Sequence, residues 1–247
     1  MSRTQALLAR SALGLVAALL ALLRCGLAHA GPPFLTDDPE PIEPGHWELY
    51  AASQGAFARD AAFVTAPHLE ANYGAGPGVQ FHAIVPAAIS WARGDHAHYG
   101  LGDVEVGVKL RFVDTDGWQL GVFPLITLAT GSERLGLGGG RTGGLLPLWL
   151  QKDAGAWKTY GGGGYRFAAE GDAVVLGWLV QRRLCDGLAL GVEAFATIPV
   201  DQALVALALN LGLVADLSDV QHLLLSAGPS FHGDVIAQAY LAYQLTL

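Results

Sequence analysis

The sequence is poor in charged residues, in cysteine and in long apolar runs. Charged residues make up 15% of the 247 positions, whereas a soluble surface usually carries about 25–35%. After residue 30 no segment has the ~18 consecutive apolar residues of a membrane-spanning helix. A net charge of −8 without a basic cluster excludes nucleic-acid binding. Since 52% of the residues are hydrophobic, an intrinsically disordered chain is also excluded.

The first thirty residues are typical of a secretory signal peptide. Arg3 and Arg10 flank its start, residues 11–23 are apolar, and residues 28–30 (Ala-His-Ala) form a small-x-small cleavage site. The apolar stretch is shorter than the ~20 residues that a membrane anchor needs. Cleavage after Ala30 would remove three of the 14 basic residues, which leaves 11 against 22 acidic ones. We therefore expect an exported, acidic mature chain.

The two cysteines do not form a disulfide framework. Cys25 leaves with the signal peptide, and Arg24 before it breaks the small-residue pattern of a lipoprotein site. Cys185 then stands alone beside a predicted turn at Asp186-Gly187. It lacks the electropositive, histidine-paired setting of a catalytic cysteine, so we expect a small buried or interfacial residue.

Side chains alternate between apolar and polar along most of the chain. The clearest case is residues 100–112 (GLGDVEVGVKLRF), where Val104, Val106 and Val108 fall on one parity and Asp103 and Lys109 on the other. A period of two places alternate side chains on opposite faces of a strand. Similar segments separated by turn signals predict twelve strands, which start near residues 46, 63, 79, 101, 118, 145, 156, 173, 188, 203, 220 and 235.

Twelve such strands predict an all-β fold: one antiparallel transmembrane β-barrel of the outer-membrane type, over residues 45–247. Short turns alternate with longer loops, and an even strand number returns both ends to the periplasmic side. The aromatic residues near predicted strand ends are typical of interface girdles; they are Trp47, Trp91, Trp118, Trp157 and Tyr243. A soluble barrel or sandwich is the alternative, and it would bury the apolar faces instead.

Residues 31–44 form an extended segment rich in proline and acidic residues. It contains five prolines and the carboxylates Asp37, Asp38, Glu40 and Glu43. One interpretation is a flexible periplasmic tail. The other is a plug that enters the barrel lumen because Lys109 or Arg111 attracts it.

Several stretches resemble a known family. They are residues 32–50 (PPFLTDDPEPIEPGHWELY), 100–112, 124–140 (PLITLATGSERLGLGGG), 161–167 (GGGGYRF) and 190–195 (LGVEAF). Together they resemble the outer-membrane β-barrel family named for the meta-pathway of phenol degradation. The resemblance implies an outer-membrane barrel that passes small aromatic compounds. Its motifs are strand and turn patterns, and they carry no functional residue over to this sequence.

Charged side chains on the predicted inner face are the candidate binding residues. We expect these residues to line the lumen: Glu70, His82, Asp103, Glu105, Lys109, Arg111, Arg183 and Glu193. They would either sort solutes by charge in a water-filled pore or pair across strands and fill the barrel. Twelve strands enclose a space between that of a filled eight-stranded barrel and that of an open porin.

Other motifs predict no chemistry. His96 and His98, beside Asp95, could bind Zn or Cu only if a third ligand converged, so we expect a solvated polar loop and no metal site. The glycine-rich stretch 136–144 lacks phosphate-loop spacing and predicts a mobile outside loop; the hypothesis is that this loop folds into the mouth as a constriction. His222 and Ser226 share one face of a strand, but their separation of about 13 Å rules out direct contact. No catalytic residue and no cofactor are expected, and an outer-membrane lipid hydrolase stays a remote alternative.

Together these observations predict an outer-membrane barrel that passes small, aromatic or hydrophobic molecules down their gradient. The main alternative is a structural or partner-binding barrel with a closed lumen. Expected partners are outer-membrane lipid, the diffusing solute and, during insertion, the barrel-assembly machinery. The last strand ends in Leu247 rather than in the usual phenylalanine.

Overall fold

A computed structural model describes residues 33–201 and 204–247 of the chain. The predicted signal peptide at residues 1–30 lies outside these ranges, as does the predicted strand start near residue 203. Apart from a short 3-10 turn at Glu133–Leu135, the regular structure of the described residues is β-strand. No helix in these ranges has the length and apolar character needed to cross a bilayer.

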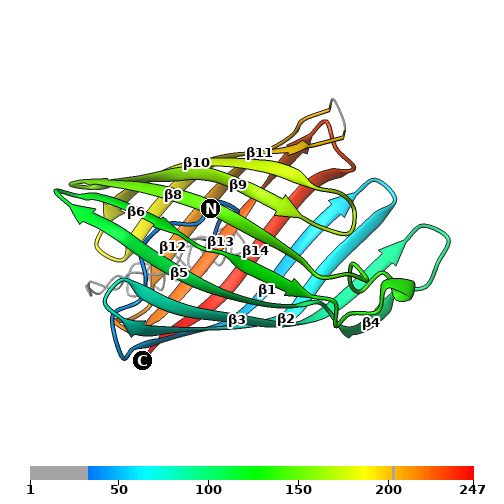
Figure 1. Cartoon of the computed structure of the whole chain (residues 1–247), viewed down its shortest axis with the longest axis horizontal. Helices are drawn as coiled ribbons and strands as arrows, with labels where there is room; N and C mark the ends of the chain where they lie inside the picture. The colour runs from blue at the N-terminus through cyan, green and yellow to red at the C-terminus, as the bar shows by residue number, and fades with distance from the viewer. Residues whose placement is uncertain (1–32, 202–203) are drawn as a thin grey trace, which may run out of the picture.

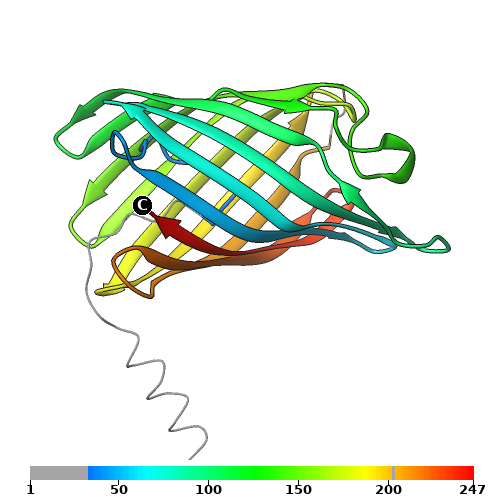
Figure 2. The same ribbon diagram turned by 90° about the horizontal axis from the view of Figure 1, so that it is seen from below.

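Fourteen strand segments build one closed barrel (Figures 1 and 2). They are β1 (Trp47–Ala58), β2 (Ala61–Gly76), β3 (Val79–Ala92), β4 (His98–Leu101), β5 (Val104–Thr115), β6 (Trp118–Val122), β7 (Leu125–Leu128), β8 (Gly143–Ala154), β9 (Trp157–Phe167), β10 (Ala173–Cys185), β11 (Leu188–Pro199), β12 (Ala206–Asp216), β13 (Gln221–Phe231) and β14 (Val235–Thr246). All pairs are antiparallel, and β1 closes the barrel against β14.

Two of the barrel strands are interrupted, so the fourteen segments make twelve strands. β3 pairs with both β4 and β5, and β8 pairs with both β6 and β7. The second interruption falls at Phe123-Pro124, where proline cannot donate to the ladder. The first falls at Gly102-Asp103, where Asp103 instead accepts hydrogen bonds from an outer loop. The predicted twelve-stranded barrel is therefore confirmed.

The apolar faces point outward and the polar faces point inward. On β5, Leu110 and Phe112 are 37% and 58% exposed, whereas Lys109, which has the opposite parity, is 4% exposed. The same alternation runs through the other strands, and the buried inner face carries Asn72, Gln80, His82, Gln119, Gln151, Glu193 and Asn210. A soluble barrel would have the opposite arrangement, so that alternative is wrong. Apolar side chains on the outside suit a lipid environment. A closed barrel suits it for a second reason, since all its backbone hydrogen bonds are made between its own strands.

The tight turns, the start of β1 and the end of β14 lie on one side of the barrel, which we call the periplasmic end. The backbone N–H of Trp47 donates to Leu247 at 2.9 Å, so the first and last strands meet there. The β2–β3 and β5–β6 turns at this end use Gly78 (φ 73°) and Gly117 (φ 75°). The predicted aromatic side chains near the strand ends are all exposed: Trp47, Trp118, Trp157 and Tyr243 lie around this end, and Trp91 lies at the outer end of β3.

The four consecutive glycines of β9 accept the side chains of neighbouring strands. A Cβ on Gly161 would lie 2.4 Å from the Trp178 ring, and one on Gly163 would lie 2.5 Å from Leu176. Both neighbours belong to β10 and are exposed on the outer face. On the inner face, the buried Trp149 covers Gly162. The glycines therefore make room for bulky residues of the flanking strands.

Candidate functional site

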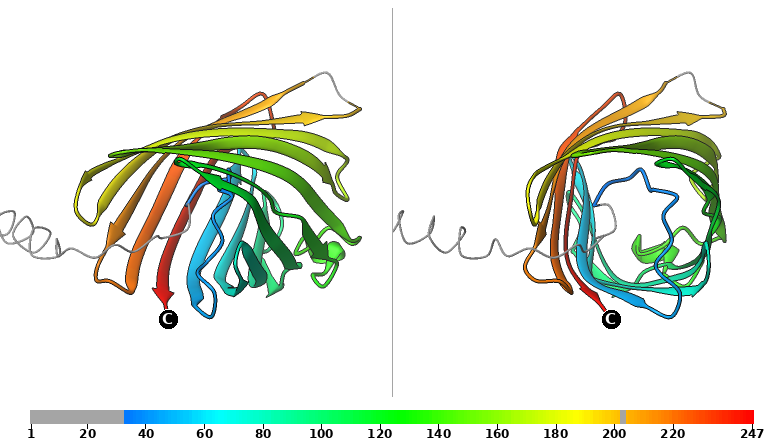
Figure 3. Two further views of the ribbon diagram at one scale, coloured as in Figure 1. Left: turned by 60° about the vertical axis from the view of Figure 1, so that its left-hand side comes forward. Right: turned by 90° about the vertical axis from the view of Figure 1, so that its left-hand side faces the viewer.

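Residues 33–45, which we call the strap, run inside the barrel ahead of β1. Figure 3 shows this blue segment within the ring of strands. Thr36 and Pro39 are fully buried, and Ser226 of β13 donates a short hydrogen bond to the carbonyl oxygen of Pro33. Of the two interpretations of the proline-rich segment, the described residues adopt the one in which it occupies the lumen.

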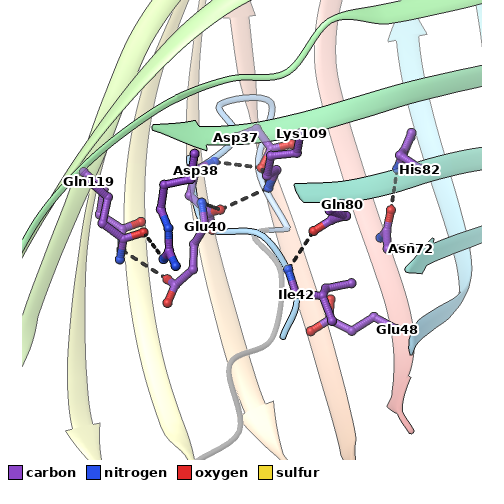
Figure 4. Close-up of polar contacts among 12 residues, drawn as sticks. Asp37, Asp38, Glu40, Ile42, Glu48, Asn72, Gln80, His82, Lys109 and Gln119 are labelled. Carbon is purple, nitrogen blue, oxygen red and sulfur yellow. Dashed lines mark hydrogen bonds and ion pairs between the residues drawn. The ribbon is translucent and has the colours of Figure 1, made fainter. Parts of the chain in front are cut away.

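Lys109 of β5 joins the strap to the barrel wall (Figure 4). Its Nζ lies 2.9 Å from Oδ1 of Asp37 and 3.1 Å from Oδ1 of Asp38. The ammonium group also lies 5.0 Å from the ring centre of Phe123. Because Lys109 is 4% exposed, water screens these ion pairs weakly. The predicted attraction to Lys109 is present, whereas Arg111 pairs instead with Asp114 and Gln119.

A second lysine holds the middle of the strap. Lys158 of β9 lies 2.8 Å from Oε2 of Glu40, and Gln151 of β8 donates to the same oxygen at 3.1 Å. Two residues further on, the backbone N–H of Ile42 donates to Gln80 of β3 at 3.0 Å. The start of the strap is held by Glu193 of β11, which lies opposite β3 in the closed strand order, so the strap crosses the lumen from wall to wall.

Glu193 of β11 holds the beginning of the strap. Its carboxylate accepts the backbone N–H groups of Leu35 and Thr36 at 3.3 and 2.5 Å. Asn210 of β12 donates a third hydrogen bond at 2.6 Å. Glu193 is 0% exposed, so it serves as a buried anchor and not as part of an open wall.

The strap lies against glycines of the barrel wall. A Cβ on Gly191 would lie 2.7 Å from the Phe34 ring, and one on Gly177 would lie 2.1 Å from the Thr36 hydroxyl. Further wall glycines whose Cβ would meet the strap are Gly74, Gly121 and Gly212. The wall thus provides a groove for the strap, and the groove exists because glycines at these wall positions leave the space that side chains would fill.

Two cavities follow one another along the lumen. The inner cavity, of about 510 Å³, lies at the periplasmic end between the strap and the wall. The outer cavity, of about 630 Å³, lies beneath the outer loops. Both are lined by His68, Ile84 and Glu105, so they adjoin at this level. Together they lead from the outer mouth of the barrel to the strap.

A polar cluster stands on the wall of the inner cavity. His82 Nδ1 lies 2.6 Å from Asn72 Oδ1 and 3.5 Å from Glu70 Oε1, and its Nε2 lies 3.5 Å from Glu105 Oε1. Asn72 also donates to Glu70 at 2.7 Å. Nearby, Tyr50 donates to Glu48 at 2.7 Å.

The glycine-rich loop between β7 and β8 folds into the outer mouth. The carboxylate of Asp103 accepts the N–H groups of Gly131 and Gly139 at 2.8 and 2.7 Å. Leu137 is 2% exposed, and its side chain lies against Gly100 of β4. Residues 136–139 line the outer cavity. The loop is therefore held against the wall at the outer mouth, and its constricting role stays a prediction.

The predicted lumen residues divide into three groups. Glu70, His82, Glu105 and Lys109 line the inner cavity, and Asp103 lines the outer one. Arg111 and Glu193 are held by polar partners on the inner face, as described above. Arg183 is exposed at the periplasmic end of β10 and is absent from the described lining of both cavities. Contact of any of these residues with a solute stays a prediction.

The sequence did not identify the other residues that hold the strap. These residues are Gln80, Gln151, Lys158, Asn210, Ser226 and the wall glycines. One signal was present in the sequence: Lys158 follows Trp157, which was predicted to face the membrane interface, so Lys158 has inward parity.

In the described residues, Ser226 and His222 have separate partners, and the histidine loop is exposed. Ser226 donates to Pro33, while His222 Nδ1 lies 2.8 Å from Asp216. In the β3–β4 loop, the backbone N–H of His96 and, less strongly, the His98 ring hold the pKa of Asp95 below its usual range. The described ranges contain no group of three or more potential metal ligands.

Comparisons with solved structures identify the fold. The chain is similar to the COG4313 outer membrane channel from Pseudomonas putida F1, with a TM-score of 0.68 and 15% identity, over 85% of this chain and 98% of that one. It is also similar to the KdgM porin in complex with disordered oligogalacturonate (TM-score 0.57, 9% identity, 81% and 98% covered) and to the NanC porin (0.54, 10%, 81% and 98%). No family model and no curated protein matches the sequence. The fold is that of outer-membrane β-barrels.

Proposed function

We propose that this protein is a passive channel of a Gram-negative outer membrane, in which small molecules diffuse down their own gradient. One observation carries the proposal: two adjoining cavities run along the lumen of a closed barrel whose outside is apolar. The predicted signal peptide, cleaved after Ala30, would deliver the chain to the periplasm, where the assembly machinery inserts it. No step of this mechanism needs a cofactor.

We further propose small aromatic or hydrophobic molecules as the solutes. The resemblance to the phenol-degradation family supports this class. The aromatic side chains around the inner cavity support it too, and they are Phe34, Tyr50, Phe123 and Tyr240. A volume of about 510 Å³ lies within the range of about 300–1,000 Å³ usual for small-molecule sites.

A barrel with a closed lumen is the second candidate, because the strap crosses the lumen from Glu193 of β11 to Gln80 of β3. Planar-bilayer recordings on the purified mature protein distinguish the two candidates. A channel gives discrete conductance steps, whereas a closed barrel gives none. A proteoliposome uptake panel of phenols and of sugars of similar size then identifies the solute class. Faster entry of sugars than of phenols would contradict the aromatic assignment.

A further inference from the structure

The two lysines that line the inner cavity are both occupied by the strap. Lys109 pairs with Asp37 and Asp38, and Lys158 pairs with Glu40. The partners come from the strap and not from neighbouring wall strands. With the strap in place, the positive charge of the described cavity lining is therefore offset.

Three glutamates of the wall have no such partner among the described residues. Glu70 and Glu105 line the inner cavity on the side of β2 and β5, and Glu48 lies beside them on β1. Among the described residues, no lysine or arginine forms an ion pair with these three glutamates. The cavity thus keeps a surplus of negative charge.

The imidazole of His82 stands between two of these carboxylates and does not remove that surplus. The His82 side chain is 6% exposed and lines the inner cavity. Its Nε2 is buried and has no hydrogen-bond partner, although Glu105 lies 3.5 Å away. Even when the His82 ring is protonated, its single positive charge offsets only one of the two negative charges of Glu70 and Glu105. An unused ring nitrogen beside a carboxylate favours a polar ligand at this point of the cavity.

We propose that the inner cavity admits cationic and neutral solutes and rejects anions, and that the strap creates this preference by neutralising Lys109 and Lys158. Within the proposed solute class, aromatic amines would pass and aromatic carboxylates would not. The physical reason is that a narrow lumen with low-dielectric walls focuses the field of its charges on the passing solute. The aromatic rings of Tyr50 and Phe123 add attraction for an organic cation. This inference rests on the proposed channel function.

The first test measures the reversal potential of the mature protein in a planar bilayer under a KCl gradient. We expect K⁺ to permeate several-fold better than Cl⁻. Glu70→Gln with Glu105→Gln lowers that ratio, whereas Asp37→Asn with Asp38→Asn and Glu40→Gln frees both lysines and moves selectivity toward Cl⁻. Asp60→Asn is the control, since this exposed carboxylate pairs with Arg93 at the outer end.

The second test compares uptake of benzylammonium and benzoate into proteoliposomes, because the two ions have nearly the same size and opposite charge. Several-fold faster entry of benzylammonium supports the proposal. Equal entry, or faster entry of benzoate, overturns the charge preference and leaves the channel function intact. Entry of neither ion, together with no conductance step in any variant, overturns both. Heat-modifiable gel mobility verifies that each variant is a folded barrel.

Discussion

Lys109 Nζ lies 3.1 Å from Oδ1 of Asp38, and this contact joins the barrel wall to the strap across 71 residues of sequence. Both side chains lie within the barrel, with 6% and 10% of their surface exposed. Because each charge is withdrawn from water, removing either partner would leave an uncompensated charge inside the lumen.

Lys109→Met tests the importance of this pair for the strap. The variant leaves two carboxylates in the lumen without their cation, and breaking a buried pair in this way typically costs about 3–5 kcal/mol. We expect the strap to leave its groove and the single-channel conductance to rise. Lys152→Met is the control, because Lys152 lies near Trp118 on the outer face. An unchanged conductance in Lys109→Met would show that other contacts hold the strap.

Gly191→Ala tests the groove itself. The new Cβ would lie 2.7 Å from the Phe34 ring, so the ring must move or the strap must lift. We expect limited proteolysis to cut the strap of this variant faster than that of the unmodified protein. Gly76→Ala is the matched control, since its Cβ would meet nothing within 4 Å.

A double variant separates strap displacement from damage to the wall. If Phe34 is the obstacle, Phe34→Ala in the Gly191→Ala background restores slow proteolysis, and the two substitutions are strongly non-additive. Additive effects would contradict the groove.

Asp103→Ala tests the constriction at the outer mouth. It removes the acceptor of two backbone N–H groups, each bond to a charged group contributing about 1.5–3 kcal/mol. The loop should then detach from the mouth and the conductance should rise, as it should when residues 132–140 are deleted. Asp95→Asn, in a neighbouring outer loop, should leave the conductance unchanged. The same conductance in the deletion variant would refute a constricting role.

Val106→Arg tests the outward direction of the apolar face. Val106 is 39% exposed on β5, and an arginine at the lipid face near the bilayer midplane costs about 2–4 kcal/mol. We expect the urea midpoint of the barrel in lipid vesicles to fall by a corresponding amount. Val106→Leu keeps the apolar surface and should unfold like the unmodified protein.

Much of the wall was predictable because alternation is a local property. The outward direction of Val106 and the inward direction of Lys109 follow from parity alone once a membrane surrounds the barrel. The predicted strand starts near residues 46, 79, 118 and 235 lie within a residue of Trp47, Val79, Trp118 and Val235. The breaks at Asp103 and Pro124 were missed, because a short interruption leaves the alternation on both sides intact.

The strap was less predictable because its contacts join distant segments. Glu193 was correctly assigned to the inner face, but no local pattern indicates that it accepts N–H groups 157 and 158 residues away. The wall glycines gave no signal either. Gly191 looks like an ordinary weak point of a strand until Phe34 is placed against it.

The strap precedes the first strand, so in the described chain its covalent link to the wall is at the β1 end, next to Gly45 (φ 86°). A constriction formed by a loop between two strands is covalently joined to a strand at each of its ends, so moving the loop strains both strands. Displacing this strap would break its contacts with the wall and none of the ladder hydrogen bonds of the barrel. A displaced strap would therefore widen the passage while the membrane-embedded wall keeps its shape.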